Sequence, residues 1–154
     1  MSRRLVTLAG VAVAVAVSLL FGGQVVARDE LVRLPIKAAL ERPEASKRLD
    51  LTVRLYFGEA PHPPPEAQMG ALRVEKKVRA LARSNEDACQ AAFLNALLAL
   101  QKEALSLSAN AVVGIVSFFQ DQPLSSSAEY QCDTGHVLAR VNLGGQFMKL
   151  PVKK

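Results

Sequence analysis

Cys89 and Cys132 are the residues of this chain best suited to covalent chemistry. They are its only two cysteines, and neither stands in a Cys-x-x-Cys motif or a zinc-finger spacing. In an exported chain, such a pair predicts one structural disulfide. The bond would close a loop of about 44 residues and contribute roughly 3–4 kcal/mol in the chain-entropy model. The alternative is a free thiolate that works with His136 as a nucleophile or metal ligand.

Two further groupings place reactive side chains close together in the sequence. His136 with Asp133 and Glu129 is a candidate metal- or ligand-binding set, and residues 125–127 are three serines that a small hydrolase would need as nucleophiles. A serine run is typical of loop composition, and no nucleophile-elbow glycines flank this one. We expect His136 to be a strand residue at a sheet edge. We therefore predict no catalytic residue, no metal ligand and no cofactor.

These residues must be positioned by a long helix that begins at Ser84 and runs into a buried strand. Ser84 and Asp87 have the spacing of a capping box, and neither Gly nor Pro interrupts the segment through Leu107. One broad apolar stripe predicts the face toward the core, and it consists of Cys89, Ala92, Phe93, Ala96, Leu97, Leu100, Ala104 and Leu107.

A second, narrower apolar ridge lies roughly 150° round the same helix. It consists of Leu94, Leu98 and Leu105. Exposed apolar ridges tend to mark interfaces. Either a loop or the N-terminal segment covers this ridge, or the three leucines form a surface for a partner or for self-association.

The segments around the helix predict an α+β fold with a mostly antiparallel sheet of about five strands. Two strands precede the helix, residues 50–57 and 71–82, separated by a proline-rich loop. Three strands follow it, residues 110–119, 128–132 and 136–143, and the last two form a closing hairpin. The predicted order is β-β-α-β-β-β, with the helix packed across one face of the sheet.

Alternation within the first of these strands assigns its apolar residues to one face. We expect that face to carry Leu51, Val53, Leu55 and Phe57. Residues 121–127 are expected to be a loop.

The first 27 residues have the features of a secretory signal peptide. Arg3 and Arg4 precede a long apolar run, which ends at the small-residue cleavage site Val25-Val26-Ala27. We predict export to the periplasm with no membrane span left after cleavage; the alternative is an uncleaved anchor.

The rest of the chain divides into three parts. Residues 28–48 are predicted to be an N-terminal arm with a short helix from Ile36 to Glu41, which Pro35 and Pro43 bracket. Residues 49–150 form a single α+β domain, and residues 151–154 are a tail.

The charge of the chain limits the class of partner. It has 19 Lys and Arg residues against 14 Asp and Glu, a formal net charge of +5, with both signs interspersed. The densest basic cluster, within residues 73–83, alternates like the wet face of a strand. Nucleic-acid binding calls for a concentrated basic face and a recognisable motif. We predict no nucleic-acid partner and a non-catalytic periplasmic protein that binds an unknown protein or envelope component, or itself. A metal- or ligand-binding protein is the alternative, followed by a small hydrolase.

Three segments carry a resemblance to a known family. They are Ala88-Cys89-x-x-Ala92-Phe93-Leu94-x-Ala96-Leu97, Ala109-Asn110-Ala111-Val112-Val113 and Glu129-Tyr130-x-Cys132. The pattern, which spans roughly residues 34–150, resembles a family of small exported proteobacterial proteins often labelled "excinuclease ATPase subunit". That label is not supported by the residues, because the chain contains no G-x-x-x-x-G-K-[ST] phosphate loop.

The helix followed by Ala-Asn-Ala-Val-Val is more distantly similar to the YbjQ-like proteins and to the outer-membrane sensor lipoprotein of the Rcs envelope-stress pathway. This similarity implies a compact sheet-and-helix domain that works by association. The chain departs from the pattern in lacking a lipid-acceptor cysteine. It also has Ser108 where a helix-ending Gly is expected, and we expect Asn110 to supply the left-handed residue instead.

Export gives the first testable prediction. Because the basic start, the apolar run and the Val-Val-Ala site agree, protein recovered from the periplasmic fraction should have an intact mass that lacks residues 1–27. A mass that retains Met1 to Ala27 would instead indicate a membrane-anchored chain.

Overall fold

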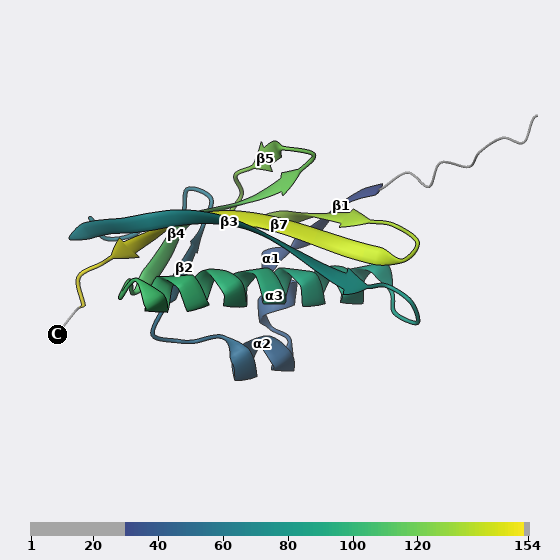
Figure 1. Cartoon of the computed structure of the whole chain (residues 1–154), viewed down its shortest axis with the longest axis horizontal. Coiled ribbons are helices and arrows are strands. Elements are labelled where there is room, and N and C mark those ends of the chain that lie inside the picture. The colour runs from purple at the N-terminus through teal and green to yellow at the C-terminus, as the bar shows by residue number, and fades with distance from the viewer. Residues whose placement is uncertain (1–29, 153–154) are drawn as a thin grey trace, which may run out of the picture.

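The structure, a computed structural model, describes residues 30–152, and the predicted signal peptide lies outside the described residues. A curled seven-stranded sheet is combined with one long helix and two short ones (Figure 1). Along the chain the elements are β1 (Glu30–Pro35), α1 (Ile36–Leu40), α2 (Pro43–Arg48), β2 (Arg54–Phe57), β3 (Ala67–Arg79), α3 (Asn85–Ser106), β4 (Ala111–Phe119), β5 (Gln122–Leu124), β6 (Glu129–Thr134) and β7 (Leu138–Lys149).

Strand β7 organises the sheet. It pairs with β3 along its whole length on one side, and with β6 and then β4 on the other. Strand β1 extends the sheet beyond β6, while β2 and β5 both pair with β4. Every pair is antiparallel except β2 with β4. The prediction of a mixed, sheet-dominated fold is confirmed, but its estimate of about five strands is too low for the seven observed. The predicted order β-β-α-β-β-β is also wrong, because β1, α1 and α2 precede β2 and four strands follow α3.

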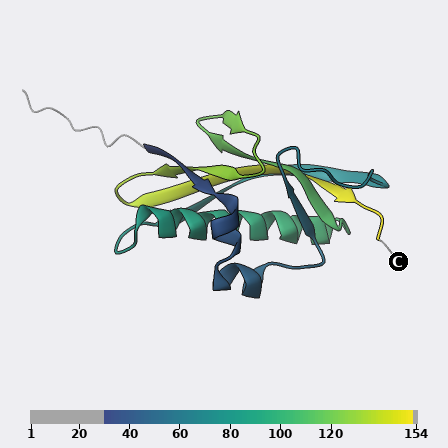
Figure 2. The same ribbon diagram turned by 180° about the vertical axis from the view of Figure 1, so that it is seen from behind.

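Helix α3 runs beneath the sheet in Figures 1 and 2, and it contacts β3, β4, β6 and β7. The Ser84 hydroxyl caps its start by accepting a hydrogen bond from the backbone N–H of Asp87, at 3.0 Å. The stripe predicted to face the core is buried, with Leu107 only partly so. On the sheet, β7 contributes Ala139, Val141, Leu143 and Phe147 to the same core.

The predicted disulfide between Cys89 and Cys132 is present and joins α3 to β6. The two Cα atoms are 5.9 Å apart, within the range that an unstrained bridge requires, and neither residue is more than 1% exposed. Next to the bridge, the ring of Phe93 stacks on that of Tyr130 at 4.0 Å between centroids and also meets Phe57 at 6.0 Å. The disulfide bond therefore lies next to a cluster of stacked aromatic rings.

The N-terminal arm contains more structure than the sequence indicated. Its short helix is present as α1, but β1 before it is part of the sheet and α2 follows it at once. Pro43, predicted to lie beyond the end of the first helix, instead occupies the first turn of α2. A proline suits that position because the first-turn N–H has no partner within the helix.

The strand predicted from residue 50 begins only at Arg54, and Leu51 is wrongly assigned to the core. Leu51 is 89% exposed, whereas Val53 and Phe57 are buried as expected. The Asp50 carboxylate accepts hydrogen bonds from the backbone N–H and the hydroxyl of Thr52, which makes residues 50–52 a turn.

Other boundaries also differ from the prediction: β3 spans Ala67–Arg79 rather than residues 71–82, and β7 spans Leu138–Lys149 rather than ending at residue 143. The left-handed residue after α3 is Ser108, with a φ of 59°, and not Asn110. Asn110 instead holds the end of the chain, because its side-chain amide exchanges hydrogen bonds of 2.8 and 2.7 Å with the backbone of Leu150. Within the predicted loop 121–127, residues 122–124 form β5, a short strand that folds back on β4.

Removal of the disulfide tests how far the fold depends on it. The double variant Cys89→Ala, Cys132→Ala should lose roughly 2–5 kcal/mol of stability, since the unfolded chain regains the freedom of the closed loop. Denaturant titration of oxidised wild type, reduced wild type and the double variant measures the difference. Equal midpoints for all three would show that the bridge contributes nothing.

Candidate functional site

The structure separates the residues proposed for metal binding. The expectation that His136 is a strand residue is wrong, because it is exposed in the turn between β6 and β7, while Glu129 lies at the opposite end of β6. Asp133 is bound to the guanidinium of Arg140, at 2.8 Å to both Nε and Nη2. Within residues 30–152 no group of three or more His, Cys, Asp or Glu side chains is arranged to hold a metal ion. With both sulfurs in the disulfide, the thiolate alternative for Cys89 and Cys132 is wrong.

The three serines have a structural explanation. The Ser126 hydroxyl accepts hydrogen bonds from the backbone N–H groups of Ala128 and Glu129, at 3.1 and 3.0 Å, and so forms the turn into β6. The backbone of Ser126 also packs so closely on Gly58 that a side chain there would lie 2.8 Å from a main-chain atom. The serines stand at the β6 end remote from His136, so the structure does not assemble a nucleophile with a base.

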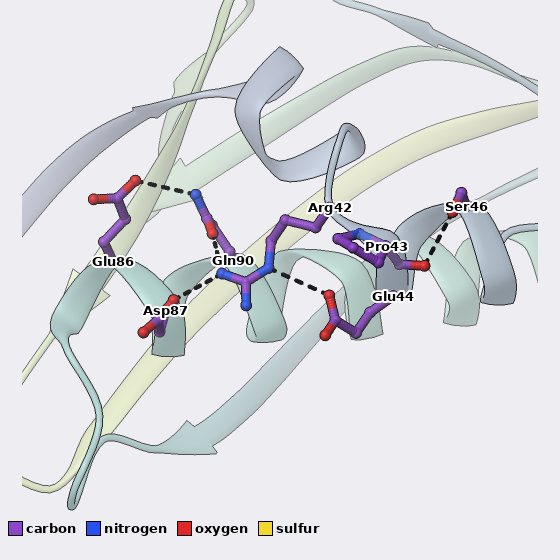
Figure 3. Close-up of polar contacts among 7 residues, drawn as sticks. All are labelled: Arg42, Pro43, Glu44, Ser46, Glu86, Asp87 and Gln90. Carbon is purple, nitrogen blue, oxygen red and sulfur yellow. Dashed lines mark hydrogen bonds and ion pairs between the residues drawn. The ribbon is translucent and has the colours of Figure 1, made fainter.

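Arg42, between α1 and α2, fixes the arm to α3. Its Nη1 donates to Asp87 Oδ1 at 2.8 Å and also to Gln90 Oε1, and its Nε faces Glu44 at 3.6 Å (Figure 3). Gln90 continues the network by donating to Glu86 at 3.1 Å. A second link, from Arg48 to Asn95 at 3.2 Å, holds the end of α2 to the same helix.

These contacts leave a pocket of about 350 Å³ between the arm and α3. It is lined by Ala39, Arg42, Glu44, Arg48, Arg83, Asp87, Gln90, Ala91 and Leu94. Its three arginines would suit an anion, but Asp87 and Glu44 already offset two of the charges. The hydrogen bond from Arg42 holds the pKa of the Asp87 carboxyl below its ordinary value, with a smaller contribution from Ser84. The network therefore serves to hold the arm in place, and sequence reasoning missed it because its partners are more than 40 positions apart.

The three leucines of the second ridge have different environments. Leu94 is 6% exposed and forms part of the pocket under the arm, so it is not available to a partner. Leu98 is partly buried, whereas Leu105 is 48% exposed. Cover by the N-terminal segment is therefore observed for Leu94, whereas Leu105 stays exposed.

The Gln101 side chain holds the turn that contains another apolar residue, Leu51, against α3. This buried side chain accepts from the backbone N–H of Asp50 at 2.9 Å and donates to the carbonyls of Asp50 and Val53. This holds the turn that carries Leu51 against α3, one helical turn before Leu105. We call Leu51, Leu98 and Leu105 the α3 leucine surface. Exposed large apolar side chains of this kind are typical of interfaces.

Comparison with protein-family models, with curated proteins and with solved structures finds no match to this chain. None of the helices within residues 30–152 combines the length and the apolar character needed to cross a bilayer. The disulfide is compatible with an exported protein.

Acid titration tests the link between the arm and the helix. Because the folded Asp87 carboxyl has a lowered pKa, it stabilises the fold above the pKa of the unfolded chain, about 3.9, and this contribution disappears as the pH falls through the folded value. Asp87→Asn should therefore be less stable than wild type at pH 7, and the difference in unfolding free energy between the two should shrink as the pH falls below about 3.9. Glu59→Gln, a change at an exposed loop residue, is the control and should follow wild type throughout. A difference between Asp87→Asn and wild type that is constant with pH would contradict this account.

Proposed function

We propose that this protein is a non-catalytic binding module of the periplasm that acts by association with a protein or another envelope component. The α3 leucine surface is the observation that carries the proposal. Leu51 is 89% exposed and Leu105 is 48% exposed, and the Gln101 hydrogen bonds hold the two segments together. A fixed apolar surface on a disulfide-linked helix suits docking, because little conformational entropy is lost when the partner binds.

The separation of the reactive residues supports association over catalysis. A hydrolase needs a nucleophile within hydrogen-bond reach of a base. Ser126 instead accepts two backbone hydrogen bonds at one end of β6, and His136 lies beyond the other end. The remaining features, the predicted signal peptide and the disulfide, favour the oxidising compartment outside the cytoplasm.

The test replaces the apolar residues of the proposed surface with a charge. Leu51→Asp with Leu105→Asp should lower the capture of the partner from envelope extracts about tenfold or more, because each buried leucine contributes roughly 1.5–3 kcal/mol. Capture is measured by quantitative mass spectrometry against wild-type bait, and melting temperature verifies that the variant is folded.

The matched control is Leu81→Asp, since Leu81 is 61% exposed but lies before the start of α3. It should capture the same component as wild type. The proposed surface would be wrong if every component that Leu51→Asp, Leu105→Asp fails to capture is also lost with Leu81→Asp, or if the double variant loses no component. Ester hydrolysis that Ser126→Ala abolishes would overturn the non-catalytic proposal itself.

A further inference from the structure

Strand β3 has one side that no described strand pairs with. It runs for 13 residues along the front of the sheet in Figure 1, and its only partner among the strands of residues 30–152 is β7. Strands usually have about five or six residues, and edge strands are usually protected by short length, proline, bulges or charged side chains. Residues 67–79 contain no proline, and the single irregularity in the pairing is a bulge between Gln68 and Gly70. Residues 70–79 are therefore a regular edge with unpaired backbone donors and acceptors.

The charges of this edge are confined to one half. Residues 67–72 are uncharged and include two exposed apolar side chains, Met69 and Leu72. Residues 73–79 contain all the charges, with four basic residues and Glu75. Parallel pairing with an identical strand would place like charges beside one another. Antiparallel pairing places the basic half opposite the uncharged half, where the aliphatic stems of Lys and Arg cover apolar residues.

We propose that the β3 edge binds the β3 edge of a second copy of this chain, antiparallel and centred on Val74, to form a continuous sheet across a two-fold axis. Centring on a residue keeps both α3 helices on one side, because inward-facing positions then oppose inward-facing positions and outward-facing positions oppose outward-facing ones.

The charged residues favour Val74 over the adjacent Glu75 as the centre of the pairing. The midpoint of residues 70–79 lies between Val74 and Glu75, so these are the two central choices. A centre at Val74 places Arg73 opposite Glu75, Lys76 opposite Leu72, and Lys77 opposite Ala71. A centre at Glu75 would place Glu75 opposite itself and Arg73 opposite Lys77, and like charges directly opposite each other are destabilising.

Arg73 lies over the ring of Phe118 at 3.9 Å and is held by Asp121 and Asn142, so its guanidinium lies on the outward face toward β7 and β4, on the side away from the open edge. Among the described residues, Glu75 forms an ion pair only with Lys77 of its own strand, at 3.0 Å, and both side chains are exposed. Glu75 is thus the residue that can be reversed with least effect on the monomer.

The first experiment is sedimentation equilibrium of the purified protein. Wild type should be dimeric, and Glu75→Arg should weaken the dimer about tenfold or more, because it creates two like-charge pairs with Arg73 across the axis. Glu59→Arg makes the same charge change away from the edge and should leave the dimer unchanged. So should the Leu51→Asp, Leu105→Asp variant, which separates this proposal from the proposed α3 leucine surface.

The second experiment tests the register by cross-linking. The Ala71→Cys, Lys77→Cys variant should form a covalent dimer on oxidation, since opposite residues in an antiparallel pair have Cα atoms about 4.5–5.5 Å apart. Within one chain these two positions are roughly 20 Å apart and cannot bond. The Ala71→Cys, Arg79→Cys variant is out of register and should stay monomeric on a denaturing gel. A wild-type protein that is monomeric up to roughly 100 μM would overturn the proposal. So would a dimer that Glu75→Arg does not weaken and in which the Ala71→Cys, Lys77→Cys variant forms no cross-link.

Discussion

The bridge between Cys89 and Cys132 joins the one long helix to the sheet at the place where Phe93 stacks on Tyr130. The bond restricts the unfolded chain, and the rings supply apolar area that burial stabilises, so covalent and packing effects act at the same point. The hydroxyl of Tyr130 has no hydrogen-bond partner in this cluster, and burial raises the pKa of its phenol. Packing here therefore outweighs the cost of one unsatisfied polar group.

One face of α3 packs against the sheet. Hydrogen bonds of two polar side chains, Arg42 and Gln101, determine which segments lie against its other faces. Arg42 holds the arm against Asp87 and Gln90, which covers Leu94. Gln101 holds the turn before β2, which carries the exposed Leu51, and Leu105, one helical turn after Gln101, is also exposed. The helix is thus divided between a core face, a face covered by the arm and the short exposed surface that we propose for docking.

The two proposed associations use different parts of the molecule. The α3 leucine surface lies on the helix side of the fold, whereas the β3 edge lies in the plane of the sheet (Figure 1). They share no residue, so a dimer formed through β3 would present two α3 leucine surfaces to a partner. Such duplication raises the apparent affinity for any partner that has two matching sites.

The sequence alone determined what depends on local spacing: the cap at Ser84, the buried stripe of α3, the pairing of the only two cysteines, the alternating strand β3 and the continuously apolar strand β4. It failed where a residue's environment is set from far along the chain. Leu51 follows the strand alternation, but Asp50 and Thr52 turn the chain there; Leu94 and Leu105 belong to one ridge, but only the first is covered by the arm. Whether an apolar side chain is core or surface depends on which distant segment packs over it, and that is decided by tertiary contacts such as those of Arg42 and Gln101 rather than by periodicity. The open edge of β3 likewise has no local signal, because a strand is at an edge only when no other strand pairs with it.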